Sequence, residues 1–175
     1  YFERTGGQVC IFGAGGSSLA TLLHLINKEN ASDRPSCLIL VNRSEGRLVN
    51  ARRMVDSLAT DIMVEYIHNS DPVKNDQVME TLPPFSLVIN ATGMGKDTPG
   101  SPITPSGVFP DHGIAWEFNY RGELDFMHQA LSQLGSRLVV PGRAFDAVPG
   151  PRHHGVQHVH PGSPVDRVGL ARDVG

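Results

Sequence analysis

The sequence has few cysteines, no long hydrophobic run and no strong excess of either charge. Its two cysteines, Cys10 and Cys37, both fall in predicted strands, which excludes a disulfide-rich fold and favours buried thiols in a reducing compartment. No segment approaches the roughly 20 apolar residues of a membrane span, and no signal peptide is visible. A net charge of −3 offers little attraction for nucleic acid or a membrane surface. These absences favour a cytoplasmic globular protein.

The sequence also lacks an initiating methionine, and we therefore expect it to be part of a longer protein. The composition changes sharply at Pro141, so we expect a globular domain over residues 1–141 and an atypical, disordered tail over 142–175. That tail has no lysine and no glutamate, but it holds four of the eight histidines. Imidazoles can bind metal, yet no cysteine accompanies them, and we assign no metal site.

Apolar runs and helical periodicities alternate along the chain with short connections. The first helix, for example, has leucines and isoleucine at helical spacing from Leu19 to Ile26. Alternation of this kind predicts an α/β fold, a doubly wound parallel sheet of the Rossmann type with helices on both faces. The predicted strands are 7–12, 37–41, 62–67, 87–89, 114–118 and 138–140, and the predicted helices are 17–30, 45–59, 71–82 and 124–134.

A glycine-rich turn follows the first predicted strand and leads directly into the first helix. Its sequence is Gly13-Ala14-Gly15-Gly16-Ser17-Ser18. Gly13 permits a tight turn, and Gly15 leaves room for a phosphate, which the free N–H groups of the helix N-terminus would face. The flanking strand and helix make this turn more than an isolated glycine motif, and it predicts a site for a dinucleotide pyrophosphate.

Two arginines follow the second strand, where this fold reads the adenosine ribose. The segment Asn42-Arg43-Ser44 contains no carboxylate for the ribose 2′-OH of NAD, and Arg43 is followed one helical turn later by Arg47. Paired guanidiniums suit the 2′-phosphate of NADP. A solvated basic helix start is the alternative, and Glu45 would repel a phosphate.

Small and polar residues follow the fourth and fifth strands. Asn90-Ala91-Thr92-Gly93-Met94 would let a cofactor lie close to the backbone, and a loop containing Lys96 comes next. Glu117 and Asn119 end the fifth strand. We interpret the single tryptophan, Trp116, as a core residue.

Taken in order, these motifs resemble the NADP-binding domain of the shikimate/quinate dehydrogenase family, which reads approximately GAGGA, NRT and NATSxGM. The segment from Glu117 to Tyr120 is similar to the family's Asp-x-x-Tyr, and the resemblance covers about residues 9–135. The resemblance implies that the glycine turn holds the pyrophosphate of NADP and that Asn42, Arg43 and Ser44 hold the 2′-phosphate. It also implies that the nicotinamide side is lined by Asn90, Ala91, Thr92 and Met94.

The family transfers hydride between NADP(H) and a cyclic hydroxy acid such as 3-dehydroshikimate, in aromatic amino acid biosynthesis. Its catalytic lysine and aspartate lie in an N-terminal substrate domain that this chain lacks, so we assign no catalytic residue and expect the chain alone to be inactive. Two departures stand out, since Glu117 replaces the usual aspartate and Gly122 stands where the family has proline.

Other functions remain open. The same cofactor domain occurs in other NADP-dependent dehydrogenases, such as methylene-tetrahydrofolate and glutamyl-tRNA reductase types, and a non-catalytic NADP-binding module would also fit. We expect a small-molecule substrate that is held mainly by the missing domain. We expect no nucleic-acid or membrane partner, and the sequence is compatible with either a monomer or a homodimer.

Overall fold

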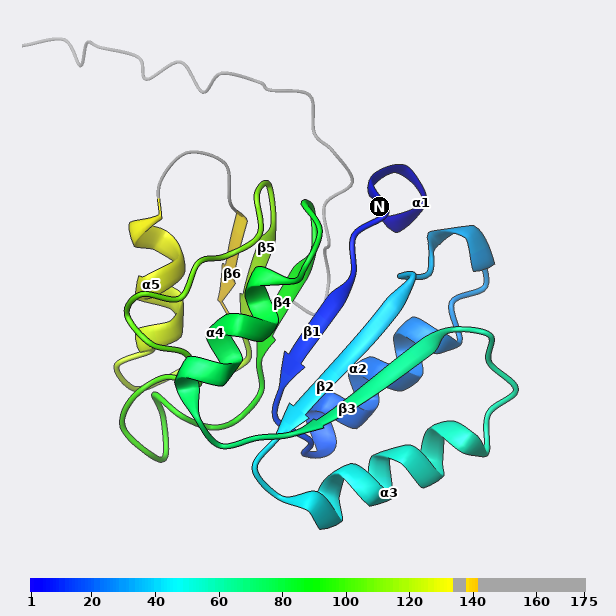
Figure 1. The fold of residues 1–175 in the computed structure, drawn as a ribbon, viewed down its shortest axis with the longest axis horizontal. Helices are drawn as coiled ribbons and strands as arrows, with labels where there is room; N and C mark the ends of the chain where they lie inside the picture. Colours follow the sequence, from blue (N-terminus) through cyan, green and yellow to red (C-terminus); the bar gives the residue numbers. More distant parts are fainter. Residues whose placement is uncertain (134–137, 142–175) are drawn as a thin grey trace, which may run out of the picture.

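A computed structural model describes residues 1–133 and 138–141 (Figure 1). The strands are β1 (Val9–Phe12), β2 (Cys37–Asn42), β3 (Met63–His68), β4 (Leu87–Asn90), β5 (Ile114–Glu117) and β6 (Leu138–Pro141). The helices are α1 (Phe2–Thr5), α2 (Gly16–Ile26), α3 (Glu45–Asp56), α4 (Pro72–Glu80) and α5 (Asp125–Ser132), with a short 3-10 helix, η1 (Ala31–Asp33).

The strands form one parallel sheet in the order β3-β2-β1-β4-β5-β6, which confirms the doubly wound fold. The chain builds outward from β1 to β3, then returns to the centre and continues from β4 to β6. The order therefore reverses between β1 and β4. In sheets of this kind, ligands bind beyond the carboxyl ends of the strands at that reversal.

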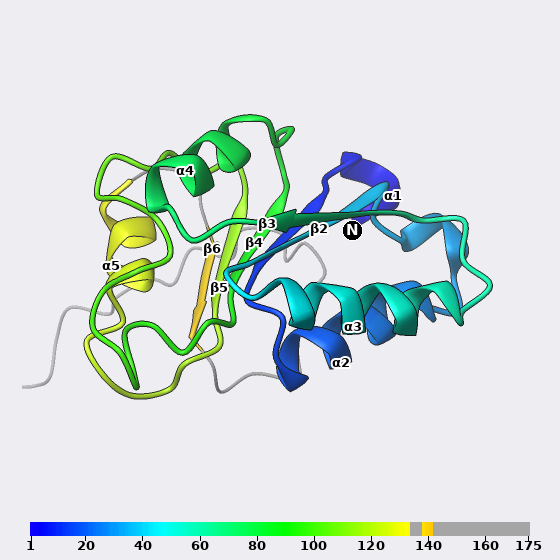
Figure 2. The same cartoon turned by 60° about the horizontal axis from the view of Figure 1, so that its bottom comes forward.

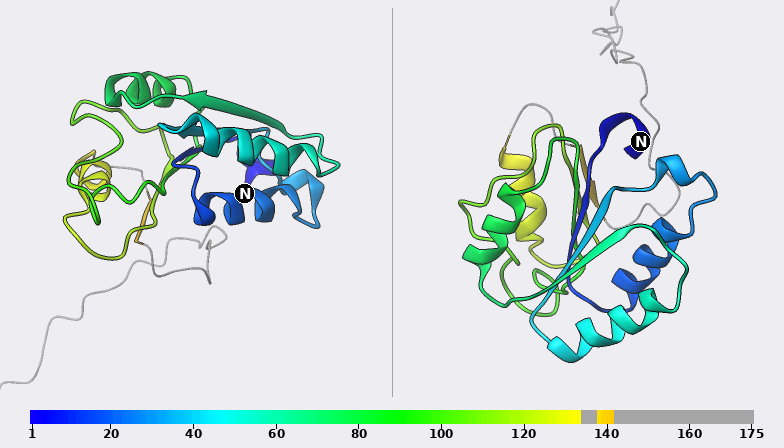
Figure 3. Two further views of the ribbon diagram at one scale, coloured as in Figure 1. Left: turned by 90° about the horizontal axis from the view of Figure 1, so that it is seen from below. Right: turned by 45° about the vertical axis from the view of Figure 1, so that its right-hand side comes forward.

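Helices cover both faces of the sheet, with α2 and α3 on one face and α4 and α5 on the other (Figures 2 and 3). Alternate residues of β1 supply the two cores, because successive side chains of a strand point to opposite faces. Ile11 packs with residues of α2 and α3, while Phe12 packs with residues of α4 and α5. Every residue of β1, β2 and β4 is buried, which accounts for their unbroken apolar runs.

Several helices end earlier than their periodicity predicts. α2 stops at Ile26 rather than near residue 30, with Asn27 as its C-cap, and the side chain of Asn30 accepts a hydrogen bond from Ser32 N (3.2 Å) at the start of η1. Two apolar residues of α2, Leu19 and Leu23, are only partly buried, and Leu19 packs against the edge of the core. The buried residues of this helix are Ser18, Thr21, Leu22, Leu25 and Ile26.

The remaining differences lie at element ends. α3 stops at Asp56 and α4 at Glu80, two or three residues short of the predicted ends, and β1 begins at Val9. The short α1 was not predicted. The predicted tail, residues 142–175, lies outside the described residues. None of the helices within 1–133 is both long and apolar enough to cross a membrane.

The start of α4 follows the predicted capping pattern. Asp71 is the N-cap, its side chain accepts a hydrogen bond from Val73 N (3.0 Å), and Pro72 occupies the first helical position. The cap satisfies one of the backbone N–H groups that a helix leaves without an internal partner.

Replacing this cap should destabilise the fold measurably. We expect Asp71→Ala to lower the free energy of unfolding by about 1 kcal/mol in urea titrations. Asp61→Ala is the matched control, because the Asp61 side chain is 88% exposed and makes only a 3.5 Å ion pair with Arg34. The control should change stability by less than about 0.5 kcal/mol. Equal losses in the two variants would contradict the capping role.

Candidate functional site

The glycine turn between β1 and α2 is held close to the chain segment that follows β4. Gly13 has a φ of 107°, and a Cβ atom built on it would lie 2.5 Å from the carbonyl oxygen of Ala91. The Gly13 N–H donates to the carbonyl oxygen of Val41 (2.8 Å) at the end of β2. Only glycine fits this position, because both the backbone angle and the space exclude a side chain.

The next two glycines are in a different situation. Cβ atoms built on Gly15 and Gly16 would meet no atom within 4 Å, and Gly15 has an ordinary extended conformation (φ −91°, ψ −173°). The fold itself therefore does not require glycine at Gly15. No side chain caps α2, so its first N–H groups are open to a ligand.

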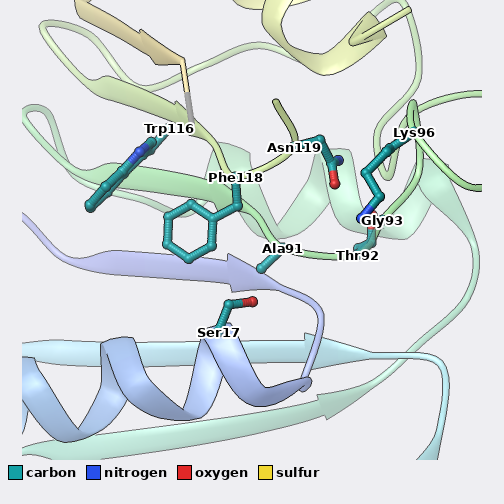
Figure 4. A pocket seen from close by; sticks show the side chains of 8 residues that line it. All are labelled: Ser17, Ala91, Thr92, Gly93, Lys96, Trp116, Phe118 and Asn119. Atoms are coloured by element: carbon teal, nitrogen blue, oxygen red, sulfur yellow. The ribbon is translucent and has the colours of Figure 1, made fainter. Parts of the chain in front are cut away.

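The serines of the turn point in different directions. Ser17 is exposed, and its side chain faces Ala91 across the opening (Figure 4). Ser18 is fully buried, and its hydroxyl has no hydrogen-bond partner among the described residues. In the dinucleotide-binding pattern G-x-G-x-x-G, Ser18 stands at the position of the third glycine, where a small residue lets the helix pack closely on the sheet. Ala14 is also buried.

The predicted 2′-phosphate residues lie at the carboxyl end of β2, next to the glycine turn. Arg43 and Arg47 are both exposed, while Asn42 is buried and its Nδ2 donates to the carbonyl oxygen of Ser44 (3.0 Å). Ser44 is the N-cap of α3, and its hydroxyl makes no capping bond. The predicted arginines therefore stand beside a second open helix N-terminus, although Glu45 in the same turn brings an opposing charge.

The ends of β4 and β5 are joined by a buried carboxylate. Asn90 and Glu117 are neighbours in the parallel register, and both are fully buried. Asn90 Nδ2 donates to Glu117 Oε2 (2.8 Å), and the backbone N–H of Asn119 donates to Glu117 Oε1 (2.8 Å). Both carboxylate oxygens accept hydrogen bonds from N–H donors, as an ionised carboxyl group does.

The same network shapes the loop after β4. Asn90 Oδ1 accepts hydrogen bonds from the backbone N–H (3.1 Å) and the hydroxyl (2.7 Å) of Thr92. The carbonyl oxygen of Met94 accepts from Asn90 Nδ2 (3.3 Å) and from Asn119 Nδ2 (2.9 Å). The motif read from the sequence as a cofactor wall is thus fixed by a polar network that includes Glu117 and Asn119.

A pocket of about 260 Å³ opens beside this network (Figure 4). The rings of Trp116 and Phe118 meet edge to face, with centroids 4.9 Å apart, and give the pocket an aromatic side. The lining residues come from three places, the start of α2, the loop after β4 and the end of β5: Ser17, Ala91, Thr92, Gly93, Lys96, Trp116, Phe118 and Asn119.

One of these residues was interpreted differently from the sequence. Trp116, expected in the core, is only partly buried and also faces the pocket. Lys96, in the loop after β4, also lines the pocket, with its Nζ 3.1 Å from a carboxylate oxygen of Asp97. Gly93 (φ 79°) and Gly95 (φ 87°) both have positive φ angles, which turn the loop back on itself. Two glycines at this spacing are a sequence pattern that favours such a turn.

The departure at Gly122 has a structural reason. Its φ is 97°, and a Cβ atom on it would lie 2.0 Å from the carbonyl oxygen of Gly95. Proline cannot adopt that angle. In this chain the loop after β4 therefore packs directly against the segment after β5, and only glycine permits the contact.

Burial raises the pKa of the Glu117 carboxyl, and the hydrogen bonds from Asn119 and Asn90 offset only part of that effect. An acid with a higher pKa in the folded chain contributes stability below its unfolded pKa of about 4.3 and loses it as pH rises through the folded value. The free-energy difference between wild type and Glu117→Gln should therefore fall as pH rises from about 4 and then level off. Urea unfolding across that range measures it, and a difference that grows with pH would contradict the assignment.

No protein-family model and no curated protein matches the sequence. Among solved structures, an Ael1 enzyme from Pseudomonas putida is similar at 22% identity and a TM-score of 0.55, over 79% of this chain and 44% of that one. The ligand-free 5-ketofructose reductase of Gluconobacter sp. strain CHM43 is similar at 18% identity and a TM-score of 0.54, over 80% of this chain and 46% of that one. This chain spans less than half the length of either protein. The likeness shows that the chain has the same Rossmann-type fold as these segments.

Proposed function

We propose that this chain is the NADP-binding domain of an oxidoreductase. The observation that carries the proposal is Gly15, a glycine that the fold does not require, standing open at the uncapped N-terminus of α2. A phosphate that approaches the helix needs that space and those N–H groups. The strand order adds support, because the turn lies where the order reverses.

The two halves of the dinucleotide would lie on either side of this turn. The adenosine half would extend toward the end of β2, where Arg43, Ser44 and Arg47 would hold the 2′-phosphate. The nicotinamide half would extend toward the ends of β4 and β5, beside Asn90, Ala91, Thr92, Gly93 and Met94. Bound NADP supplies the hydride chemistry, and the residues of this chain bind and orient it.

We further propose a substrate of the shikimate type, a cyclic hydroxy acid held mainly by a domain outside this chain. The ordered motifs after β1, β2 and β4 support this assignment. The solved structure named a reductase supports only the broader class of oxidoreductase. The groups that complete the reaction would then come from the other domain, since the only lysine of the pocket, Lys96, is paired with Asp97.

Gly15→Ala separates ligand binding from folding. Its backbone angles suit alanine, so the free energy of unfolding should change by less than about 1 kcal/mol. The added methyl group should meet the pyrophosphate, and NADPH affinity should fall roughly five- to 150-fold in fluorescence titrations. Gly13→Ala should instead destabilise the fold by roughly 1–3 kcal/mol or more, because its φ is positive and its Cβ would meet Ala91. Unchanged NADPH affinity in Gly15→Ala would overturn the pyrophosphate assignment.

Arg43→Ala tests the choice of dinucleotide. Loss of a charge-assisted contact to the 2′-phosphate should weaken NADP binding by roughly 10- to 150-fold and leave NAD binding nearly unchanged. Arg53→Ala is the matched control, because Arg53 is also an exposed arginine of α3 but lies in its last turn. Calorimetry with both dinucleotides measures the ratio. Equal weakening of NADP and NAD by Arg43→Ala would refute the 2′-phosphate assignment.

A further inference from the structure

Asn119 is a polar residue that the folded chain uses only in part. It is 6% exposed, yet it lines the pocket. Its backbone N–H donates to Glu117, and its Nδ2 donates to the carbonyl oxygen of Met94 (2.9 Å). No residue in the described part of the chain donates a hydrogen bond to its Oδ1. An amide oxygen that faces a pocket with its acceptor capacity unused offers a hydrogen bond to a ligand that can donate one.

The network decides which way this amide faces. The Met94 carbonyl oxygen can only accept, so the amide nitrogen of Asn119 must face it and the amide oxygen must face away. Figure 4 shows that oxygen directed into the pocket. Glu117 fixes the backbone of Asn119, and Asn90 donates to both Glu117 and Met94. A chain of four groups thus holds one acceptor at a defined place.

The pocket suits one planar ring with an amide substituent. Its volume of about 260 Å³ is below that of sites for drug-sized ligands, and Trp116 and Phe118 line one side with aromatic surface. It lies beyond β4 and β5, on the side of the glycine turn away from Arg43. A dinucleotide that placed its adenosine half near Arg43 would therefore bring its nicotinamide ring here, with a carboxamide NH₂ group as donor.

We propose that Asn119 Oδ1 accepts a hydrogen bond from the carboxamide of the nicotinamide, and that Glu117 is the positioning residue that holds Asn119 for this contact. The inference rests on the proposed function. It assigns to this chain a contact that recognises the reactive half of the cofactor, in addition to the groups that hold the phosphates.

The experiment uses three probes on the 175-residue chain: NADP, its analogue in which a methyl ketone replaces the carboxamide, and 2′,5′-ADP, which lacks the nicotinamide half. Wild type should bind the analogue about three- to tenfold more weakly than NADP, because the ketone has no N–H to donate. Asn119→Ala should bind NADP and the analogue equally. Its affinity for 2′,5′-ADP should stay at the wild-type value, as calorimetry would show.

Glu117→Gln tests the positioning role. Its amide nitrogen would oppose either the Nδ2 of Asn90 or the backbone N–H of Asn119, depending on how the amide is oriented. Either clash should disturb the network and abolish the discrimination between NADP and the analogue, while binding of 2′,5′-ADP persists. Loss of 2′,5′-ADP binding in this variant would indicate a merely structural role and overturn the positioning claim. If Glu117→Gln does not fold, Glu117→Asp can be tested in its place, because it keeps the charge but shortens the side chain.

The outcomes separate the two levels of inference. If the wild-type chain binds NADP and the analogue with equal affinity, that result alone overturns the proposed Asn119 contact. The contact is also overturned if Asn119→Ala leaves the ratio of the affinities for NADP and the analogue unchanged. Wild type that binds neither NADP nor 2′,5′-ADP would instead refute the proposed function.

Discussion

The hydrogen bond between Asn90 and Glu117 is the interaction on which the site depends. It joins the carboxyl ends of β4 and β5 where both residues are fully buried. From it extend the bonds that shape the loop after β4 and fix Asn119 at the pocket wall. A buried carboxylate is costly unless its oxygens are satisfied, and here each oxygen accepts from an N–H group. The network therefore tolerates little change in any one member.

Contacts between the two loops extend this constraint. The carbonyl oxygen of Gly95 accepts from the N–H of Leu124 (3.3 Å), and Leu124 itself has a φ of 54°, which is unfavourable for a residue with a side chain. Gly122 must lack a side chain for the same approach. Strain of this kind persists only where the surroundings impose it, and it often lies near functional sites. The loop after β4 is thus held by both its own network and the segment after β5.

The fold was largely predictable because its signals are local. Buried parallel strands give unbroken apolar runs, and Asp71-Pro72 marks a helix start through its own side chain and ring. Helix ends were predicted less well, since α2 ends at Ile26 and the capping side chain of Asn30 belongs to η1 instead. The pocket was predicted least well. The roles of Trp116 and Asn119 in the pocket depend on segments more than 20 residues away, such as the loop that holds Met94, and no local pattern encodes those contacts.

The fold constrains the glycines of the turn after β1 very differently. Gly13 is required by the protein, because its φ and the Ala91 carbonyl oxygen both exclude a Cβ atom. Gly15 is required by nothing in the described residues. Glycine is favoured over alanine at an N-cap, but no neighbouring atom excludes a Cβ atom at Gly15 as one does at Gly13. Under the proposed function, a phosphate would occupy the space that Gly15 leaves at the uncapped N-terminus of α2.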